Sequence, residues 1–227
     1  MERINNIFNN KIAFLVFAIV LLSIPSFGHT INYQFEDRPT TDVFGYYTWL
    51  GFQHILPNGF DHILFVFGLF LLNPKLKSVI AQASCFTIAH TVTLILSANG
   101  TIQPNSSIIE PIIALSIVFI AVENLFTTEM KATRYFVIFG FGLIHGMGFA
   151  TALNDIGLPR DAFYTSLIAF NVGVELGQIT ILVAAYFLIG KLFSEKIWYR
   201  QRVVYPLSIG IALIAGFWTI ERLFFTS

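Results

Sequence analysis

The sequence predicts an all-α integral membrane protein, a polytopic bundle of six transmembrane helices that follows a signal peptide. Hydrophobic residues make up 56% of the 227 residues, charged residues make up only 11%, and long apolar segments recur along the chain. A water-soluble domain of this size needs more charge to cover its surface. The 25 phenylalanines suit a surface that faces lipid. Because 13 basic and 13 acidic residues leave no net charge, we expect membrane lipid and no nucleic acid as a partner.

The N-terminal stretch has the pattern of a secretory signal peptide over residues 1–28. A polar, basic start precedes an apolar run over 12–24, and small residues follow up to Gly28. Cleavage after Gly28 leaves His29 as the new N-terminus and 29–227 as a single six-helix transmembrane domain. The alternative is an uncleaved anchor helix, and both interpretations place the next segment on the outer side.

Six apolar segments follow, of which the first is short. That segment, 61–73, cannot cross a hydrocarbon core of about 30 Å alone, and an aromatic-rich stretch, 44–56, precedes it. Because Pro57 separates the two, we expect a first span preceded by a broken or interfacial helix. The remaining segments are long enough to span as single helices, and they cover 77–97, 108–126, 134–154, 163–190 and 203–225.

Charges in the loops give the predicted bundle a direction. With the N-terminus outside, the inward loops and their margins hold eight bases, namely Lys75, Lys77, Lys131, Arg134, Lys191, Lys196, Arg200 and Arg202. The outward loops hold one base, Arg160. This bias predicts a multi-pass protein of the cytoplasmic (inner) membrane, with both mature termini on the outer side.

Ionisable side chains within spans are costly in a bilayer and need a partner or a function. On the six-span arrangement five of them lie towards the outer side, and we take these as candidate metal ligands: His54, Asp61, His62, His90 and His145. Imidazole and carboxylate without a cysteine cluster suit a borderline divalent cation such as Ni²⁺, Zn²⁺ or Fe²⁺. The alternative is that each histidine makes an ordinary interhelical hydrogen bond. The one cysteine, Cys85, lies in an apolar run and is interpreted as a small buried hydrophobe.

Four further polar residues are candidates for an ion pathway or for supporting the ligands: Glu110, Asn171, Glu175 and Gln178. The last three share one helical face, because Asn171 and Gln178 lie four residues before and three residues after Glu175.

Other residues are given structural roles. Gly142 and Gly146 bracket His145 and allow a neighbouring helix to approach closely. Glu123 is expected to pair with Lys131 or Arg134. Asn58 is expected to cap the helix that holds Asp61, and Arg222 is placed with Glu221 at the membrane interface.

Five stretches of the sequence form an ordered pattern. They are GFQHILPNGFDHILFVFGL over 51–69, FTIAHTVTL over 86–94, the segment 110–124 with its ALSI, GFGLIHGMGFA over 140–150, and FNVGVELGQ over 170–178. In order and spacing they resemble the HupE/UreJ family of hydrogenase and urease accessory membrane proteins. That resemblance implies that the protein moves or handles nickel, with hydrogenase or urease maturation machinery as partners.

The resemblance also implies site residues. A His-x₅-Asp-His signature of the family is tied to the metal, and here it corresponds to His54, Asp61 and His62 with six residues in place of five. The family's later signature has two nearby histidines around a His-Gly step and a glutamate. Here His145 has no such second histidine, and Glu175 lies on the next span. The chain therefore resembles the broader branch of the family, to which nickel specificity is extrapolated.

Three functions are consistent with the sequence. The favoured one is a divalent metal-ion permease, or a metal-handling accessory membrane protein, with nickel or zinc at a His/Asp site on the outer side. The second is an intramembrane zinc-dependent hydrolase that acts on lipid, with Ser84 near the histidines. The third is a structural membrane subunit, which predicts histidines scattered in space. The first and third, unlike the second, are not enzymes.

Overall fold

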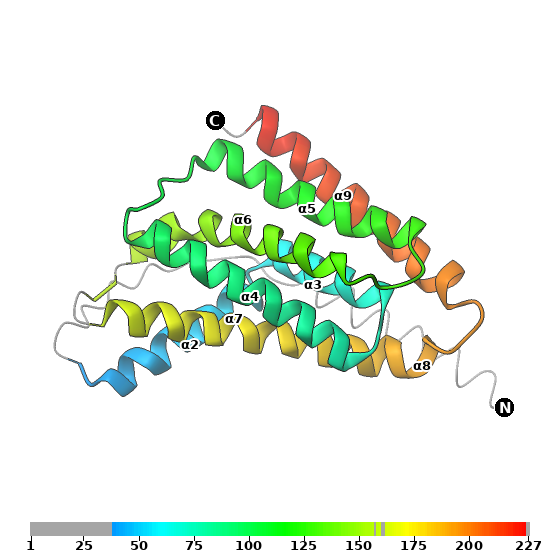
Figure 1. Ribbon diagram of the computed structural model, residues 1–227, viewed down its shortest axis with the longest axis horizontal. Helices are drawn as coiled ribbons and strands as arrows, with labels where there is room; N and C mark the ends of the chain where they lie inside the picture. Colours follow the sequence, from blue (N-terminus) through cyan, green and yellow to red (C-terminus); the bar gives the residue numbers. More distant parts are fainter. Residues whose placement is uncertain (1–37, 157, 160–161, 226–227) are drawn as a thin grey trace. The chain divides into compact units, whose positions relative to one another are not determined.

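The computed structural model describes residues 38–156, 158–159 and 162–225 (Figure 1). Helices and their connections account for this part of the chain, and no strand occurs in it, so the predicted all-α class is confirmed. The predicted signal peptide, 1–28, and His29 lie outside the described residues and stay predictions.

The helices follow the predicted apolar segments closely. Their bounds are α2 (Thr40–Ile55), α3 (Phe60–Leu72), α4 (Leu76–Ala98), α5 (Ser106–Phe126), α6 (Thr133–Ile156), α7 (Phe163–Ala185), η1 (Tyr186–Gly190), α8 (Lys191–Phe193), η2 (Arg200–Val204) and α9 (Tyr205–Phe224). The π-helical turns η1 and η2 join α7 to α8 and lead into α9. The positions and lengths of the apolar segments were therefore enough to locate the long helices, whereas η1, α8 and η2 were not predicted as separate elements.

Four helical runs are long and apolar enough to cross a membrane, namely Leu76–Ala98, Ser106–Phe126, Phe163–Phe193 and Arg200–Phe224. The pair formed by α2 and α3 passes the same test together and makes a fifth candidate, bent by 71° at its break. Several side chains of α6 lie outside the described residues, and α6 is not among these candidates. The total of six spans therefore stays a prediction.

The break between α2 and α3 agrees with the predicted broken lead-in. α2 ends at Ile55, and the chain turns through residues 56–59 before α3 begins. The predicted cap on α3 was wrong: Gly59 is the N-cap residue, and no side chain caps the helix. Asn58 belongs to the end of α2 instead, since its backbone N–H donates to the Gln53 carbonyl at 3.2 Å. A Cβ on Gly59 would overlap the carbonyl oxygen of His54, so the turn folds directly against α2.

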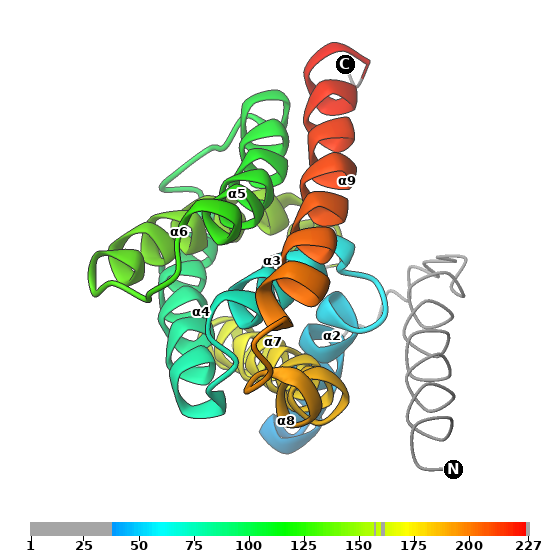
Figure 2. The same cartoon turned by 90° about the vertical axis from the view of Figure 1, so that its right-hand side faces the viewer.

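Two helix pairs are in backbone contact, α4 with α6 and α2 with α7 (Figure 2). Gly142 and Gly146 of α6 lie against the carbonyl oxygens of Phe86 and His90 on α4, where any Cβ would overlap them. The predicted close approach at this glycine pair is confirmed. Gly173 of α7 meets α2 in the same way. These contacts bring the backbone carrying His90 next to the helix carrying His145.

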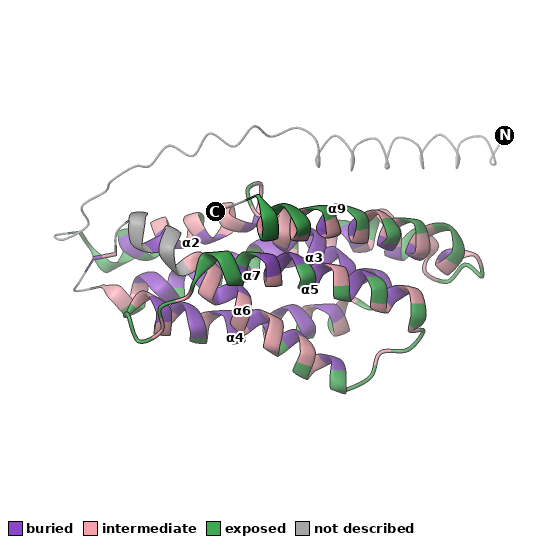
Figure 3. Cartoon of the chain, turned by 90° about the horizontal axis from the view of Figure 1, so that it is seen from above, coloured by how far each residue is buried: buried purple, intermediate pink, exposed green. Residues whose placement is uncertain are grey.

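The surface of the bundle is apolar. Figure 3 shows buried residues along the inward faces of the helices and exposed residues along the outside. Large hydrophobic side chains occupy much of that outside, including Ile88, Phe136, Leu213 and Phe217, each more than half exposed. Such a surface is a liability in water and is expected in lipid.

Most basic side chains of the described residues lie at one end of the bundle. The loops after α3, α5 and α8 carry most of the predicted inward bases and lie at the same end in Figure 1. Of the two predicted partners of Glu123, Arg134 is the one that pairs with it, at 3.0 Å. Which end faces the cytoplasm stays the prediction made from the loop charges.

Replacing Gly146 by alanine should destabilise the protein by about 1–3 kcal/mol, because the added methyl must push α4 away from α6. Gly140→Ala on the same helix is the matched control, since a Cβ there meets nothing within 4 Å. Thermal unfolding of both variants in detergent measures the difference. Equal melting temperatures would contradict the close contact described here.

Candidate metal centre

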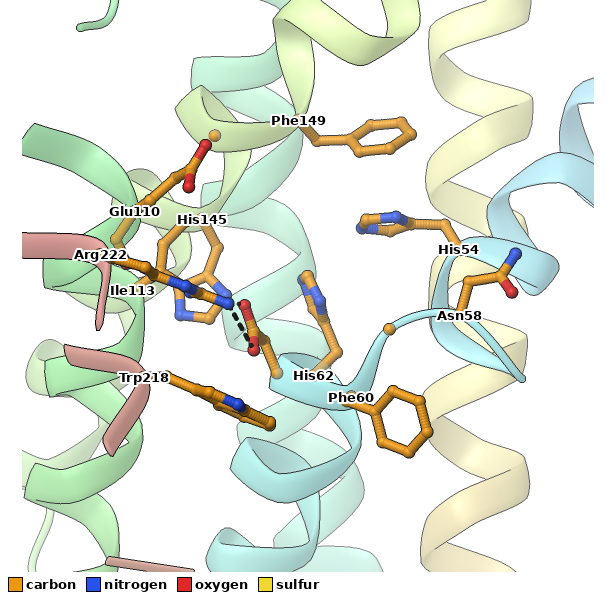
Figure 4. Close-up of a pocket in the computed structure, with 13 residues that line it drawn as sticks. His54, Asn58, Phe60, His62, Glu110, Ile113, His145, Phe149, Trp218 and Arg222 are labelled. Carbon is orange, nitrogen blue, oxygen red and sulfur yellow. Dashed lines mark hydrogen bonds and ion pairs between the residues drawn. The ribbon is translucent and has the colours of Figure 1, made fainter. Parts of the chain in front are cut away.

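Four histidines from four helices meet inside the bundle. His54 comes from the last turn of α2, His62 from the first turn of α3, His90 from α4 and His145 from α6. The ring of His62 is central: its centroid lies 4.8 Å from that of His54, 5.1 Å from that of His145 and 6.0 Å from that of His90. Figure 4 shows three of these rings around one pocket. The histidines predicted to lie at one depth are thus in contact with one another.

Three of these histidines offer ligand atoms close enough to share one ion. One ring nitrogen each of His54, His62 and His90 lies within 4.8 Å of the other two. Zn–N bonds measure about 2.1 Å, and tetrahedral coordination places two nitrogens on one ion about 3.4 Å apart. The nitrogens therefore need to approach one another by up to about 1.4 Å to bind a metal together, which requires side-chain rotations.

The hydrogen bonds of His90 prepare its Nε2 atom as a ligand. Its Nδ1 lies 3.0 Å from Oδ1 of Asn171, and the Asn171 amide is oriented by donating its N–H to the Leu167 carbonyl at 2.8 Å. Since Oδ1 can only accept, Nδ1 of His90 carries the proton. Nε2 then carries a lone pair, and it is buried without a hydrogen-bond partner. Metal-binding histidines are commonly held in this way by a polar group behind the ring.

The hydrogen bonds of His145 place its proton on Nε2, whereas that of His90 is on Nδ1. The hydroxyl of Ser116 donates to the Ile113 carbonyl at 2.7 Å, so its oxygen accepts from Nε2 of His145 at 2.9 Å. The lone pair of His145 is therefore on Nδ1, which is also buried without a partner. His145 is not part of the three-nitrogen group, but it lines the same cavity as His54 and His62.

The buried nitrogens fit a cation. Nε2 atoms of His54 and His62 are likewise buried without a partner, so each of the four histidines has one such nitrogen. Buried polar atoms are nearly always hydrogen-bonded, and a set of exceptions that converges on one place needs an explanation. A divalent cation accepts electron pairs from neutral imidazoles and satisfies these atoms together.

Aromatic side chains hold the histidine rings in place. The ring of Phe149 lies 3.9 Å from that of His54, and Phe86 lies 5.0 Å from His145 and 5.8 Å from His62. These rings pack against the imidazoles and limit their rotation. The closure required for metal binding therefore takes place within a packed environment.

A cavity of about 450 Å³ leads to the histidines. Its wall contains His54, His62 and His145 together with polar groups from α3, α5 and α9 (Figure 4). Among them is Asp61, whose carboxylate is held by Arg222 through contacts of 2.9 and 3.2 Å. The structure therefore places the predicted carboxylate at the cavity, but paired with a guanidinium and outside the three-nitrogen group.

The remaining candidates fall in two places. Glu110 lines the same cavity with an exposed side chain, and its carbonyl accepts from Arg222 at 3.2 Å. The other three candidates lie along α7 where it faces α4. There Asn171 binds His90, Gln178 accepts from Thr87 at 3.1 Å, and Glu175 accepts from Ser84 at 2.5 Å.

Polar side chains of α4 and α7 form a continuous seam between the two helices, made of Ser84, Thr87, Asn171, Glu175 and Gln178. This seam borders a second cavity of about 370 Å³. Asn171 connects this seam to the histidines, because its side chain lies against His90 and also lines the second cavity.

Sequence reasoning did not place Arg222 or Trp218 at the site. Both lie on α9, more than 150 residues after Asp61 in the chain, and both line the cavity. The one available signal was that Arg222 lies on a predicted span, where a guanidinium needs a partner.

Residues 30–222 match the family described as HupE / UreJ protein. The chain belongs to the HupE/UreJ family. Comparisons with curated proteins and with solved structures gave no match. Family membership and the apolar helices together support a metal-related accessory role in a membrane, and the histidines provide a place where a metal can bind.

Replacing Asn171 by leucine should weaken metal binding about 10–100-fold, because His90 loses the acceptor that keeps its lone pair on Nε2. Asn171→Asp is the matched control, since it keeps an acceptor oxygen at the same position. Zn²⁺ titration of the purified variants against a fluorescent chelator measures the effect. Equal affinities for Asn171→Leu and the wild type would show that this hydrogen bond does not prepare the ligand.

Proposed function

We propose that this HupE/UreJ protein is a divalent metal-ion permease, or a metal-handling accessory protein, of the inner membrane. Its ion site is on the outer side, and nickel is the first candidate ion. The observation that carries the proposal is the convergence of buried, unpartnered ring nitrogens of His54, His62 and His90. The ion is the transported or delivered substrate in this proposal.

The donor set supports a borderline divalent ion. Three neutral imidazoles bind Ni²⁺, Zn²⁺ or Cu²⁺ well and bind Mg²⁺ or Ca²⁺ poorly, since the latter prefer oxygen. A doubly charged ion among neutral ligands also needs a nearby negative charge in a low-dielectric interior. Asp61 and Glu110 are the carboxylates on the wall of the cavity, and Asp61 is adjacent in sequence to the ligand His62.

The onward route follows the seam between α4 and α7. Asn171 connects His90 to the groove that contains Glu175 and Ser84, and Gln178 lies beside it on α7. Oxygen ligands bind a borderline ion more weakly than imidazole does. A strong nitrogen site followed by weaker oxygen sites favours capture at one end and release further along.

The geometry argues against a structural subunit, which predicts scattered histidines, whereas these rings lie 4.8–6.4 Å apart in the pairs that include His54, His62 and His90. For the hydrolase, the hydroxyl of Ser84 donates to Glu175 and borders the cavity on the α4–α7 side. The histidines themselves also suit a catalytic zinc, so metal retention has to separate the hydrolase from the permease.

Substituting the site should abolish metal uptake. In metal-starved cells that express the protein, His62→Gln, His90→Gln and Asp61→Asn should each reduce Ni²⁺ accumulation about tenfold or more, because each removes a ligand or its counter-charge. Glu129→Gln, which neutralises an exposed carboxylate on the α5–α6 loop, is the control and should accumulate Ni²⁺ like the wild type. Undiminished uptake by the three site variants would refute the proposal.

Elemental analysis separates transport from metal-dependent hydrolysis. A permease should yield protein that gains Zn²⁺ or Ni²⁺ on dialysis and loses it to a mild chelator. A hydrolase should retain close to one zinc per chain through purification. Retention of stoichiometric zinc against the chelator would favour the enzyme.

A further inference from the structure

Arg222, in the last turn of α9, makes several polar contacts at the cavity. Its two terminal nitrogens reach both carboxylate oxygens of Asp61, at 2.9 and 3.2 Å, and Nη1 also donates to the Glu110 carbonyl at 3.2 Å. Its guanidinium lies 5.7 Å from the centre of the Trp218 ring. Figure 4 shows the Arg222 side chain reaching from α9 into the pocket that His62 and His145 also line.

These contacts pair Asp61 with a cation that belongs to the protein itself. A guanidinium is charged at all physiological pH values, and its fork matches the two oxygens of a carboxylate. The pair therefore has no net charge, and it lies on the wall of the same cavity as His54, His62 and His145. Two carboxylates line the cavity, those of Asp61 and Glu110, and a divalent ion that enters meets a guanidinium already bound to the first of them.

We propose that Arg222 is the residue that controls occupancy of the site: its guanidinium occupies Asp61 until an incoming divalent ion displaces it. This inference rests on the proposed function. The ion takes over Asp61 as counter-charge while the three histidines supply its nitrogen ligands. Arg222 then acts as an internal competitor, and it sets both the affinity and the charge selectivity of the site.

The pair is suited to exchange. Its side chains are 20% and 23% exposed, and partly hydrated ion pairs are much weaker than fully buried ones. Arg222 lies in the last turn of α9, whose end at Phe224 is exposed. A released guanidinium there still interacts favourably with the C-terminal carbonyls of its helix and with Trp218.

Charge selectivity follows from the exchange. A monovalent ion brings to Asp61 the same charge that Arg222 already supplies, so it gains little by replacing a bidentate guanidinium. A divalent ion at the same distance is attracted twice as strongly. It also gains the imidazole nitrogens, which alkali ions bind poorly. Only an ion that binds Asp61 and the histidines more strongly than Arg222 binds Asp61 can enter the site, and divalent ions meet this condition.

The test measures Zn²⁺ affinity of the purified full-length protein by competition with a fluorescent chelator, with Ni²⁺ as a second probe. R222Q should bind Zn²⁺ about tenfold more tightly than the wild type, because it removes the competitor. R222K keeps the charge but cannot hold both oxygens, so its gain should be about threefold. R202Q is the matched control, since Arg202 also lies 5.7 Å from a tryptophan ring, that of Trp198. It should bind like the wild type.

The mechanism is tested by a double-mutant cycle with Asp61. If Arg222 acts by occupying Asp61, the gain in affinity from R222Q is several-fold smaller in the D61N background, where only repulsion between the guanidinium and the ion is removed. A gain of equal size in D61N, or an R222Q affinity equal to or below that of the wild type, overturns the inference. Gel-filtration profiles and melting temperatures establish that the variants are folded, and R222K decides the question if R222Q does not fold. Failure of the proposed function has a different signature, because H62Q would then bind Zn²⁺ as tightly as the wild type.

Discussion

Direct backbone contact between helices, which only glycine permits, is the constraint on which the rest of the structure depends. On α6, Gly146 lies against the carbonyl of His90, and Gly59 lies against the carbonyl of His54 at the bend. With larger residues the helices would stand farther apart, and imidazole rings from four elements could not share one space. The glycines therefore position the ligands although none of them supplies a donor atom.

The close packing buries polar ring atoms of the histidines away from water. Each of the four histidines keeps one ring nitrogen buried without a partner, while polar groups such as Asn171 and Ser116 define the tautomers of His90 and His145. Among the ion pairs of the described residues, the one at this cavity joins Asp61 to Arg222. The resting site is therefore neutral imidazole beside a neutralised carboxylate. Such a site remains stable in a low-dielectric interior until a cation supplies charge.

Most of the helices and the histidine set could be predicted from the sequence. Apolar segments of about 20 residues and loops with turn-forming or charged residues have a local cause, so helix bounds follow from local patterns. Histidines in apolar spans stand out because a bilayer penalises them wherever they occur. The sequence also predicted that Glu123 pairs with either Lys131 or Arg134, since both bases lie within eleven residues of it in the chain.

By itself, the sequence determined the helical class, the element bounds, the broken first pair and the side chains able to bind a metal, because these depend on short-range periodicity and residue chemistry. Tertiary structure alone decided which of those side chains meet. The turn at 56–59 brings His54 to His62 despite the additional residue between His54 and Asp61, and Gly59 starts α3 where Asn58 was expected to cap it. Arg222 reaches Asp61 across 161 positions of sequence. Contacts over that separation depend on how whole helices pack, which no local pattern encodes.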